Sequence, residues 1–196
     1  MADELKKNNK IEARAEALIR LKKILDSSVE DAQRGLDFHL SSFLKTYTGR
    51  WGCFSPMVGE ASPRLAIQEN QHLEWAYPKI NGENLDFFVN PGSWQKGKFG
   101  IEEPNPSQSE QVSVHTLNGY LIPGLAFDRW GTRLGRGWGY FDRALESFTG
   151  LRVGVSFEAL VFAEALPRES FDVPVDVLIT EQGVLFINSK GDRRND

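Results

Sequence analysis

Apolar residues in the first part of the chain recur at helical spacing. From Lys10 onward, Ile11, Leu18, Leu21 and Leu25 are separated by steps of three, four and seven residues. Such steps bring side chains to one face of a helix. We therefore predict an amphipathic helix that starts near Lys10 and buries this face.

A second helix is predicted after the polar residues 26–28. Ser27 and Glu30 have the spacing of a capping box, which marks a helix start. Gly35 weakens this helix slightly, because glycine has a low helix propensity. The apolar positions that share its expected buried side are Ala32, Leu36, Leu40, Phe43 and Tyr47.

After Gly49 the pattern changes to short apolar runs of strand length. Tight turns are expected at Asn81-Gly82 and Gln182-Gly183. The region 91–113 is rich in Gly, Pro, Ser and Gln, which predicts a long loop. The strands are expected at 51–54, 74–80, 85–89, 117–122, 151–157, 176–180 and 184–187, with helices from Pro63 and over 139–149. Alternating strands and helices predict one α/β domain with a mainly parallel sheet.

Composition narrows the class of protein. The 196 residues suffice for one domain, and we expect it to span 10–187, with polar tails at 1–9 and 188–196. A net charge of −4 argues against a general nucleic-acid binder. No apolar run reaches the roughly 20 residues that span a bilayer, and the N-terminus lacks a secretory signal. Cys53 is the single cysteine. We therefore expect a cytoplasmic protein that binds neither membrane nor nucleic acid.

A glycine-rich basic segment follows the strand expected at 117–122. Glycines let backbone N–H groups converge on a phosphate, and arginines add bidentate donors. The segment has neither the GxGxxG spacing of a dinucleotide fold nor the Gly-Lys-Ser/Thr of a P-loop. A simple glycine-rich turn remains an alternative. The residues concerned are Gly131, Gly135, Gly137 and Gly139 with Arg129, Arg133 and Arg136.

Several charged residues have both a structural and a functional interpretation. Asp142, near a predicted helix start, caps the helix or holds Mg²⁺ against phosphate. Asp172 is a loop carboxylate or a second metal ligand. Lys10 and Arg14 lie four residues apart and form a solvated basic face or a polyphosphate clamp. Glu60 is a surface residue or binds the polar edge of a heterocycle. The histidines lack metal-ligand spacing, and no nucleophilic triad is indicated.

The chain resembles 5-formyltetrahydrofolate cyclo-ligase, also called methenyltetrahydrofolate synthetase. The resemblance extends from Lys10 to about Glu181. Its strongest part runs from Pro123 to Arg143. The supporting pieces are the Lys10/Arg14 pair, Phe54-Ser55-Pro56 with Glu60, the segment from Phe99 to Pro104, and Leu166-Pro167 followed by Asp172, Asp176 and Thr180-Glu181.

The resemblance implies a three-layer α/β/α domain and an ATP-dependent ligase. Such an enzyme closes a ring on a reduced folate through a phosphorylated formyl intermediate, releases ADP and phosphate, and uses Mg²⁺. Arg133 and Tyr140 are the implied catalytic residues, and Asp142 and Asp172 the implied metal ligands. The implied ATP-binding residues are Lys10, Arg14, Arg133, Leu134, Gly135, Arg136, Gly137, Trp138, Gly139, Tyr140 and Phe141. The implied folate-binding residues are Phe54, Glu60, Trp94 and Tyr140.

Two other functions stay open at this stage. Val161 stands where the family usually has glutamine, and Phe141 where a second tyrosine is usual. A folate- or nucleotide-binding member with lost or altered turnover is therefore an alternative. A sugar-phosphate isomerase of related architecture would also use a phosphate loop, because fold alone does not set chemistry. We expect a monomer whose partners are a reduced folate and ATP.

Overall fold

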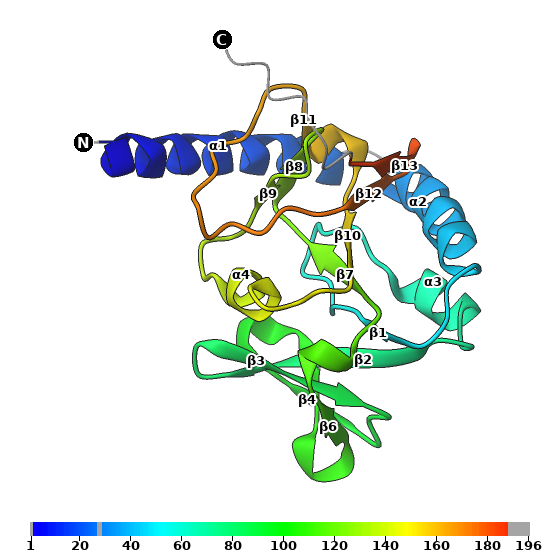
Figure 1. The fold of residues 1–196 in the computed structure, drawn as a ribbon. Coiled ribbons are helices and arrows are strands. Elements are labelled where there is room, and N and C mark those ends of the chain that lie inside the picture. Colours follow the sequence, from blue (N-terminus) through cyan, green and yellow to red (C-terminus); the bar gives the residue numbers. More distant parts are fainter. Residues whose placement is uncertain (1, 27–28, 188–196) are drawn as a thin grey trace.

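An eight-stranded sheet forms the centre of the molecule (Figure 1). The computed structural model describes residues 2–26 and 29–187. In spatial order the strands are β13 (Gly183–Phe186), β12 (Val177–Thr180), β10 (Leu151–Val155), β7 (Gly119–Pro123), β1 (Arg50–Gly52), β2 (Glu74–Asn81), β3 (Asn84–Val89) and β6 (Glu110–Val112). The pairs that join β12, β10, β7, β1 and β2 are parallel. Antiparallel strands flank them on both sides, which confirms the predicted mainly parallel sheet.

Helices lie on both faces of this sheet. The side chains of β7 alternate between the two cores that these helices cover. Leu121 joins the core cluster that includes residues of α1 (Ala2–Leu25), α2 (Val29–Leu44) and α3 (Arg64–Glu69). Tyr120 and Ile122 join the cluster beneath α4 (Tyr140–Leu145). Successive strand residues point to opposite faces, so β7 contributes to both cores. The fold is the mixed α/β architecture that was predicted.

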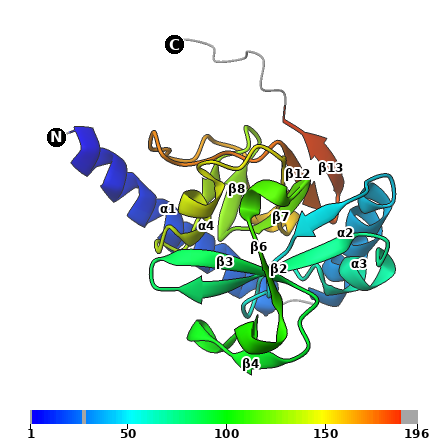
Figure 2. The same cartoon turned by 60° about the horizontal axis from the view of Figure 1, so that its bottom comes forward.

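Two smaller sheets accompany the central one. The strands β11 (Val161–Phe162), β8 (Ala126–Asp128) and β9 (Arg133–Leu134) form the first, and β4 (Trp94–Lys96) with β5 (Glu102–Pro104) forms the second. Four 3-10 helices lie at Lys98–Gly100, Pro106–Gln108, Val114–Thr116 and Glu158–Leu160. Figures 1 and 2 both draw β4 at the bottom of the molecule, remote from the N-terminus of α1.

The region 91–113 is not the structureless loop that was predicted. It contains β4, β5 and β6, and β6 extends the central sheet by pairing with β3. Each of these strands has three residues. A segment of that length is too short to show a period of two, so the sequence pattern gave no strand signal.

The predicted buried face of α1 is wrong except at Leu21. Ile11, Leu18 and Leu25 are about half exposed, whereas Ala17 and Leu21 are buried. Apolar residues lie on more than one side of this helix, so spacing alone does not select the face that packs. The helix also begins at Ala2, before the predicted start and inside the expected polar tail.

Other predicted boundaries shift by a few residues. Asn81 pairs with Asn84 across the β2–β3 hairpin, so its loop is Gly82-Glu83. The helix predicted over 139–149 is shorter, because α4 ends at Leu145. In α2 the predicted residues Leu36 and Leu40 are buried. The capping residue Ser27 and the tail 188–196 lie outside the described residues.

Candidate active site

The glycine-rich segment connects the small sheet to α4. β9 ends at Leu134 and α4 begins at Tyr140, so residues 135–139 form the connection. Gly137 and Gly139 have φ angles of 101° and 69°. Residues with a Cβ rarely adopt such values, which explains the glycines. Because α4 has only six residues, an anion here would be held by loop amides and basic side chains rather than by a helix dipole.

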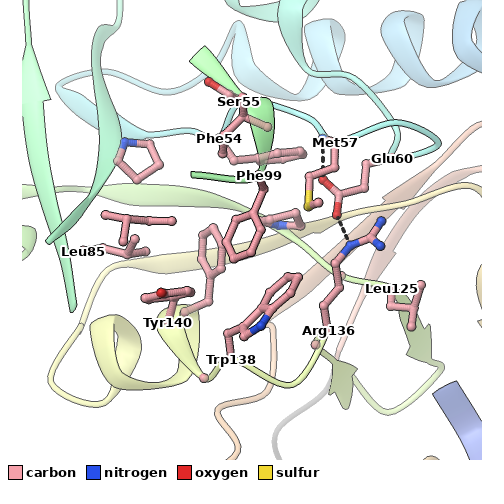
Figure 3. A pocket seen from close by; sticks show the side chains of 18 of the residues that line it. Phe54, Ser55, Met57, Glu60, Leu85, Phe99, Leu125, Arg136, Trp138 and Tyr140 are labelled. Atoms are coloured by element: carbon pink, nitrogen blue, oxygen red, sulfur yellow. Dashed lines mark hydrogen bonds and ion pairs between the residues drawn. The ribbon is translucent and has the colours of Figure 1, made fainter. Parts of the chain in front are cut away.

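This segment borders a pocket, and side chains that line the pocket are drawn in Figure 3. Its empty volume, which includes space open to solvent, is about 790 Å³. The lining combines apolar side chains with a few charged ones. It includes Phe54, Ser55, Met57, Glu60, Pro78, Ile80, Leu85, Phe99, Ile101, Glu103, Pro123, Gly124, Leu125, Arg133, Gly135, Arg136, Trp138, Gly139, Tyr140, Phe141 and Asp142.

Arg133, which is buried, and Asp142, which is partly buried, form an ion pair at the wall of this pocket. Arg133 Nη2 donates to Asp142 Oδ1 at 2.6 Å, and Arg133 Nη1 lies 3.4 Å from the Pro123 carbonyl. Arg133 is 7% exposed, and its Nε has no hydrogen-bond partner among the described residues. A buried donor without a partner costs free energy, so a ligand that accepts from this guanidinium would be stabilised.

Arg136 and Glu60 form a second ion pair in the same pocket. Arg136 Nε donates to Glu60 Oε1 at 3.0 Å, and the Met57 amide donates to Glu60 Oε2 at 2.9 Å. Figure 3 shows both interactions on one side of the pocket. The pair joins the glycine-rich segment to the loop that follows β1. Arg136, predicted to bind ATP, and Glu60, predicted to bind folate, therefore form an ion pair with each other.

The predicted phosphate clamp on α1 reaches two different segments. Arg14 Nε donates to the Gly135 carbonyl at 3.0 Å, which ties α1 to the glycine-rich segment. Lys10, one turn earlier, is buried and forms ion pairs with Glu169 and, at 2.6 Å, with Asp172. Neither residue lines the pocket. Arg14 is thus next to the predicted loop, whereas Lys10 is engaged by acidic residues.

The two predicted metal ligands do not share the pocket. Asp142 lines it, but Asp172 does not. Asp172 Oδ2 faces Lys10 and accepts a hydrogen bond from the Glu169 amide at 2.7 Å. Over residues 2–26 and 29–187, no three His, Cys, Asp or Glu side chains converge as metal ligands. Of the two predicted ligands, only Asp142 lies at the pocket wall, where it is paired with Arg133.

Aromatic side chains close one side of the pocket. Phe99 stacks on Trp138 with ring centroids 4.1 Å apart and planes 27° from parallel, and Figure 3 shows the two rings together. Phe99 has a φ of 63°, a strained value for a residue with a side chain. Lys98 Nζ donates to the Tyr140 hydroxyl at 3.0 Å. These contacts join the segment 98–100 to the glycine-rich segment across the pocket.

The remaining predicted residues divide between pocket and core. Phe54 and Phe141 line the pocket. Leu134 is buried in the core, and its carbonyl accepts from the Leu125 amide at 2.8 Å. Trp94 lies outside this pocket, with its ring 4.8 Å from Tyr77 and edge-on to it. The pocket therefore gives no support to a folate role for Trp94.

The sequence analysis assigned no role to several pocket residues, among them Ile80, Leu85 and Glu103. Ile80 comes from β2, Leu85 from β3 and Glu103 from β5. Glu103 belongs to a segment that contributed to the family resemblance, but nothing in that pattern assigned it a role. Its burial, with 3% exposure, is the signal that distinguishes it, and burial becomes visible only in the folded structure.

The sequence matches the 5-formyltetrahydrofolate cyclo-ligase family model over residues 6–181. The chain belongs to the 5-formyltetrahydrofolate cyclo-ligase family. This membership confirms the resemblance inferred from the glycine-rich motif. It also makes the chain a member of a family of enzymes.

Cyclo-ligases of known sequence and related solved structures agree with this assignment. The chain is 34% identical over 132 residues to the 5-formyltetrahydrofolate cyclo-ligase of Haemophilus influenzae, covering 62% of this chain and 70% of that one. It is 35% identical over 146 residues to the mitochondrial 5-formyltetrahydrofolate cyclo-ligase of Arabidopsis thaliana, covering 65% and 53%. The NMR structure of 5,10-methenyltetrahydrofolate synthetase from Aquifex aeolicus superposes with a TM-score of 0.78 and 33% identity, over 95% of this chain and 96% of that chain.

Some of the sequence alignments cover only part of the related protein. The chain spans about half the length of the Arabidopsis relative that it matches. Fold similarity to the Aquifex protein covers nearly all of both chains and confirms the α/β class of this cyclo-ligase family member. In the part of the chain that the structure describes, no helix is both long and apolar enough to cross a bilayer.

Proposed function

We propose that the protein catalyses the ATP-dependent cyclisation of 5-formyltetrahydrofolate to 5,10-methenyltetrahydrofolate, with release of ADP and phosphate. The observation that carries the proposal is the position of Arg133. Its buried guanidinium, with an unpartnered Nε, lies where the basic glycine-rich segment meets an apolar pocket. Such a junction suits a reaction between a phosphate chain and a flat organic substrate.

The chemistry explains why ATP is needed. The N5 formyl group is amide-like, so its carbon is a weak electrophile and its oxygen a poor leaving group. Transfer of the γ-phosphoryl group to the formyl oxygen releases ADP and gives a phosphorylated formyl intermediate. N10 then attacks the formyl carbon, the N10 proton is lost, and phosphate departs with that oxygen. No covalent enzyme nucleophile is required, which accords with the absence of a recognisable triad in the sequence.

Positioning and charge neutralisation are then the tasks of the protein. Arg133 donates to phosphoryl oxygens once its Nη2 is released from Asp142, and Arg136 does so after leaving Glu60. The amides of residues 135–139 supply further donors. Arg14 holds this segment through its bond to the Gly135 carbonyl. Lys10 reaches the phosphates once it separates from Asp172.

Mg²⁺ is part of the proposal, and the donor set suits it at one position. Asp142 offers a hard carboxylate oxygen on the pocket wall, and Mg²⁺ in phosphoryl-transfer sites binds one or two carboxylates together with phosphates and water. Bound there, Mg²⁺ would neutralise phosphate charge. Asp142 is now paired with Arg133, so it has to exchange this partner for the metal ion. Asp172 is a second ligand only after release from Lys10.

On the folate side, Phe54 offers an aromatic face and Glu60 a carboxylate. Tyr140 donates through its hydroxyl to the formyl oxygen, because Lys98 already donates to that hydroxyl and orients it. Arg133 and Tyr140 are thus the two residues proposed to act on the reacting groups. A monomeric state and a cytoplasmic location complete the proposal.

The test is whether the protein forms the methenyl product only with MgATP. Near-ultraviolet absorbance measures the amount of product. Purified protein is mixed with 5-formyltetrahydrofolate and MgATP, with controls that lack ATP or contain a non-hydrolysable analogue. Absorbance should rise only with MgATP, with one ADP formed for each product molecule. Folate binding without any product in a single turnover would contradict the proposal and favour a binding protein that has lost turnover.

A further inference from the structure

Three carboxylates line the pocket, and one of them differs from the others. Glu60 is paired with Arg136 and Asp142 with Arg133, both in the glycine-rich region. Glu103 has no arginine partner among the described residues. Its ion pair is with Lys79 of β2, at 3.1 Å. Glu103 is therefore held by β2 rather than by the glycine-rich segment that carries the proposed phosphate site.

The hydrogen bonds of Glu103 leave it with spare acceptor capacity. Its Oε2 accepts from Lys79 Nζ at 3.1 Å, and its Oε1 lies 3.4 Å from the Ile80 amide. Both distances are long for hydrogen bonds of a carboxylate, which usually measure 2.7–2.9 Å. An ionised carboxylate offers about four lone-pair sites. At 3% exposure, water has little access to the remaining ones.

The backbone around Glu103 is shaped to hold this carboxyl group. A Cβ placed on Gly97 would lie 2.1 Å from Glu103 Cδ, so only glycine permits the approach. The pocket lining nearby in the sheet is apolar, with Ile80 on β2 and Leu85 on β3. Burying a charged group among apolar side chains is costly. An anchor for the β4–β5 hairpin alone would not require a carboxylate that also faces the pocket.

We propose that Glu103 recognises the pterin ring of the folate, by accepting hydrogen bonds from its 2-amino group and its N3–H. These two donors are coplanar and point the same way, so one carboxylate can accept both. The flat ring then lies among the apolar side chains. The inference rests on the proposed function, because it assigns the orientation of that substrate. It directs the formyl end of the folate toward Arg133 and Tyr140.

The test compares two ligands and two matched variants. Glu103→Gln keeps the shape but removes the second acceptor oxygen. Glu102→Gln changes the exposed neighbouring carboxylate, whose distance to Arg64 is 3.9 Å. Calorimetry without nucleotide measures how tightly the wild type and each variant bind 5-formyltetrahydrofolate and its 2-desamino-2-methyl analogue. Glu103→Gln should bind the natural folate about 10-fold more weakly or worse, with ATP affinity unchanged, whereas Glu102→Gln should match the wild type.

The analogue separates recognition from structural support. The wild type should bind it more weakly than the natural folate, and Glu103→Gln should add little further loss, because the missing amino group no longer needs an acceptor. Lys79→Met removes the cation but keeps the carboxylate, so it should retain the preference for the natural folate. If Glu103→Gln fails to fold, Lys79→Met still tests the inference through this ligand preference.

Several results would overturn the inference, and they separate its failure from a failure of the proposed function. Suppose that Glu103→Gln still forms the methenyl product. If it binds both ligands more weakly by the same factor, or binds both as tightly as the wild type does, the pterin role alone is refuted. Loss of the ligand preference in Lys79→Met refutes it as well. A wild-type protein that binds neither folate refutes the proposed function, and the inference with it.

Discussion

Arg136 and Glu60 are joined by a 3.0 Å ion pair inside the pocket, although they belong to opposite halves of the proposed site. Arg136 lies in the segment expected to bind phosphate, and Glu60 in the loop expected to face the folate. Each neutralises the other in the absence of ligand. Phosphate that attracts Arg136 therefore releases Glu60, so the two substrates should bind with positive coupling.

The coupling is measured as the effect of nucleotide on folate affinity. A non-hydrolysable ATP analogue with Mg²⁺ should tighten binding of 5-formyltetrahydrofolate about 5-fold, since a partly buried pair of this kind contributes roughly 1 kcal/mol. In Arg136→Gln this ratio should fall toward one. Arg129→Gln is the control, because Arg129 pairs with Glu158 outside the pocket. An unchanged ratio in Arg136→Gln would refute the coupling.

Asp142→Asn tests the metal assignment. The amide keeps the size of the side chain and can still accept from Arg133, but it is a poor ligand for Mg²⁺. Turnover should fall about 100-fold or more, because charge stabilisation in phosphoryl transfer is worth several kcal/mol, and the Mg²⁺ concentration for half-maximal rate should rise. Asp176→Asn is the matched control, since Asp176 pairs with Arg152 away from the pocket. Unaltered metal dependence in Asp142→Asn would show that Asp142 is not a ligand.

Arg133→Ala should separate nucleotide binding from folate binding. The guanidinium is proposed to contact phosphate, so the KM for ATP should rise by a factor of 10 or more, while the dissociation constant for the folate alone changes little. The variant leaves Asp142 unpaired, so its melting temperature is measured alongside. A larger loss of folate affinity than of ATP affinity would reassign Arg133 to the folate side.

Tyr120 supplies a prediction about stability. Its hydroxyl is buried without a hydrogen-bond partner among the described residues, so Tyr120→Phe should leave the free energy of unfolding unchanged or raise it by up to about 1 kcal/mol. Burial also raises the pKa of Tyr120 above its ordinary value of 10.0. The unfolded chain therefore ionises first, and the wild type should lose stability as pH rises above 10.

Removal of the hydroxyl should reduce this alkaline loss. Urea unfolding at neutral pH and at several pH values above 10 measures both effects. Tyr77, whose pKa burial also raises, keeps contributing to the alkaline loss in the variant. A Tyr120→Phe protein that is less stable than the wild type at neutral pH would indicate a polar partner for the hydroxyl.

The basic half of the pocket was predictable from sequence because it is local in the chain. The glycines and arginines of 133–139 lie in one short segment, and the φ angles of Gly137 and Gly139 favour the residue type found there. Strands such as β7, β10 and β12 were predictable for the same reason, since each is a short, mainly apolar segment.

The apolar half was not predictable, because it is assembled by strand pairing. Ile80, Leu85 and Glu103 come together through the β2–β3 hairpin and the β4–β5 hairpin. No spacing within the chain reports such contacts. The ion pairs of Lys10 with Asp172 and of Arg136 with Glu60 join residues far apart in sequence. The sequence analysis predicted roles for these residues, but it could not predict which residues they pair with.

The central claim is that the formyl oxygen is phosphorylated in this pocket before the ring closes. It is tested most directly with 5-formyltetrahydrofolate that carries oxygen-18 in the formyl group, incubated with the protein and unlabelled MgATP. The released phosphate is then analysed by mass spectrometry. The account predicts that each phosphate released with the methenyl product carries the formyl oxygen-18. Unlabelled phosphate, with the label recovered in water, would contradict it.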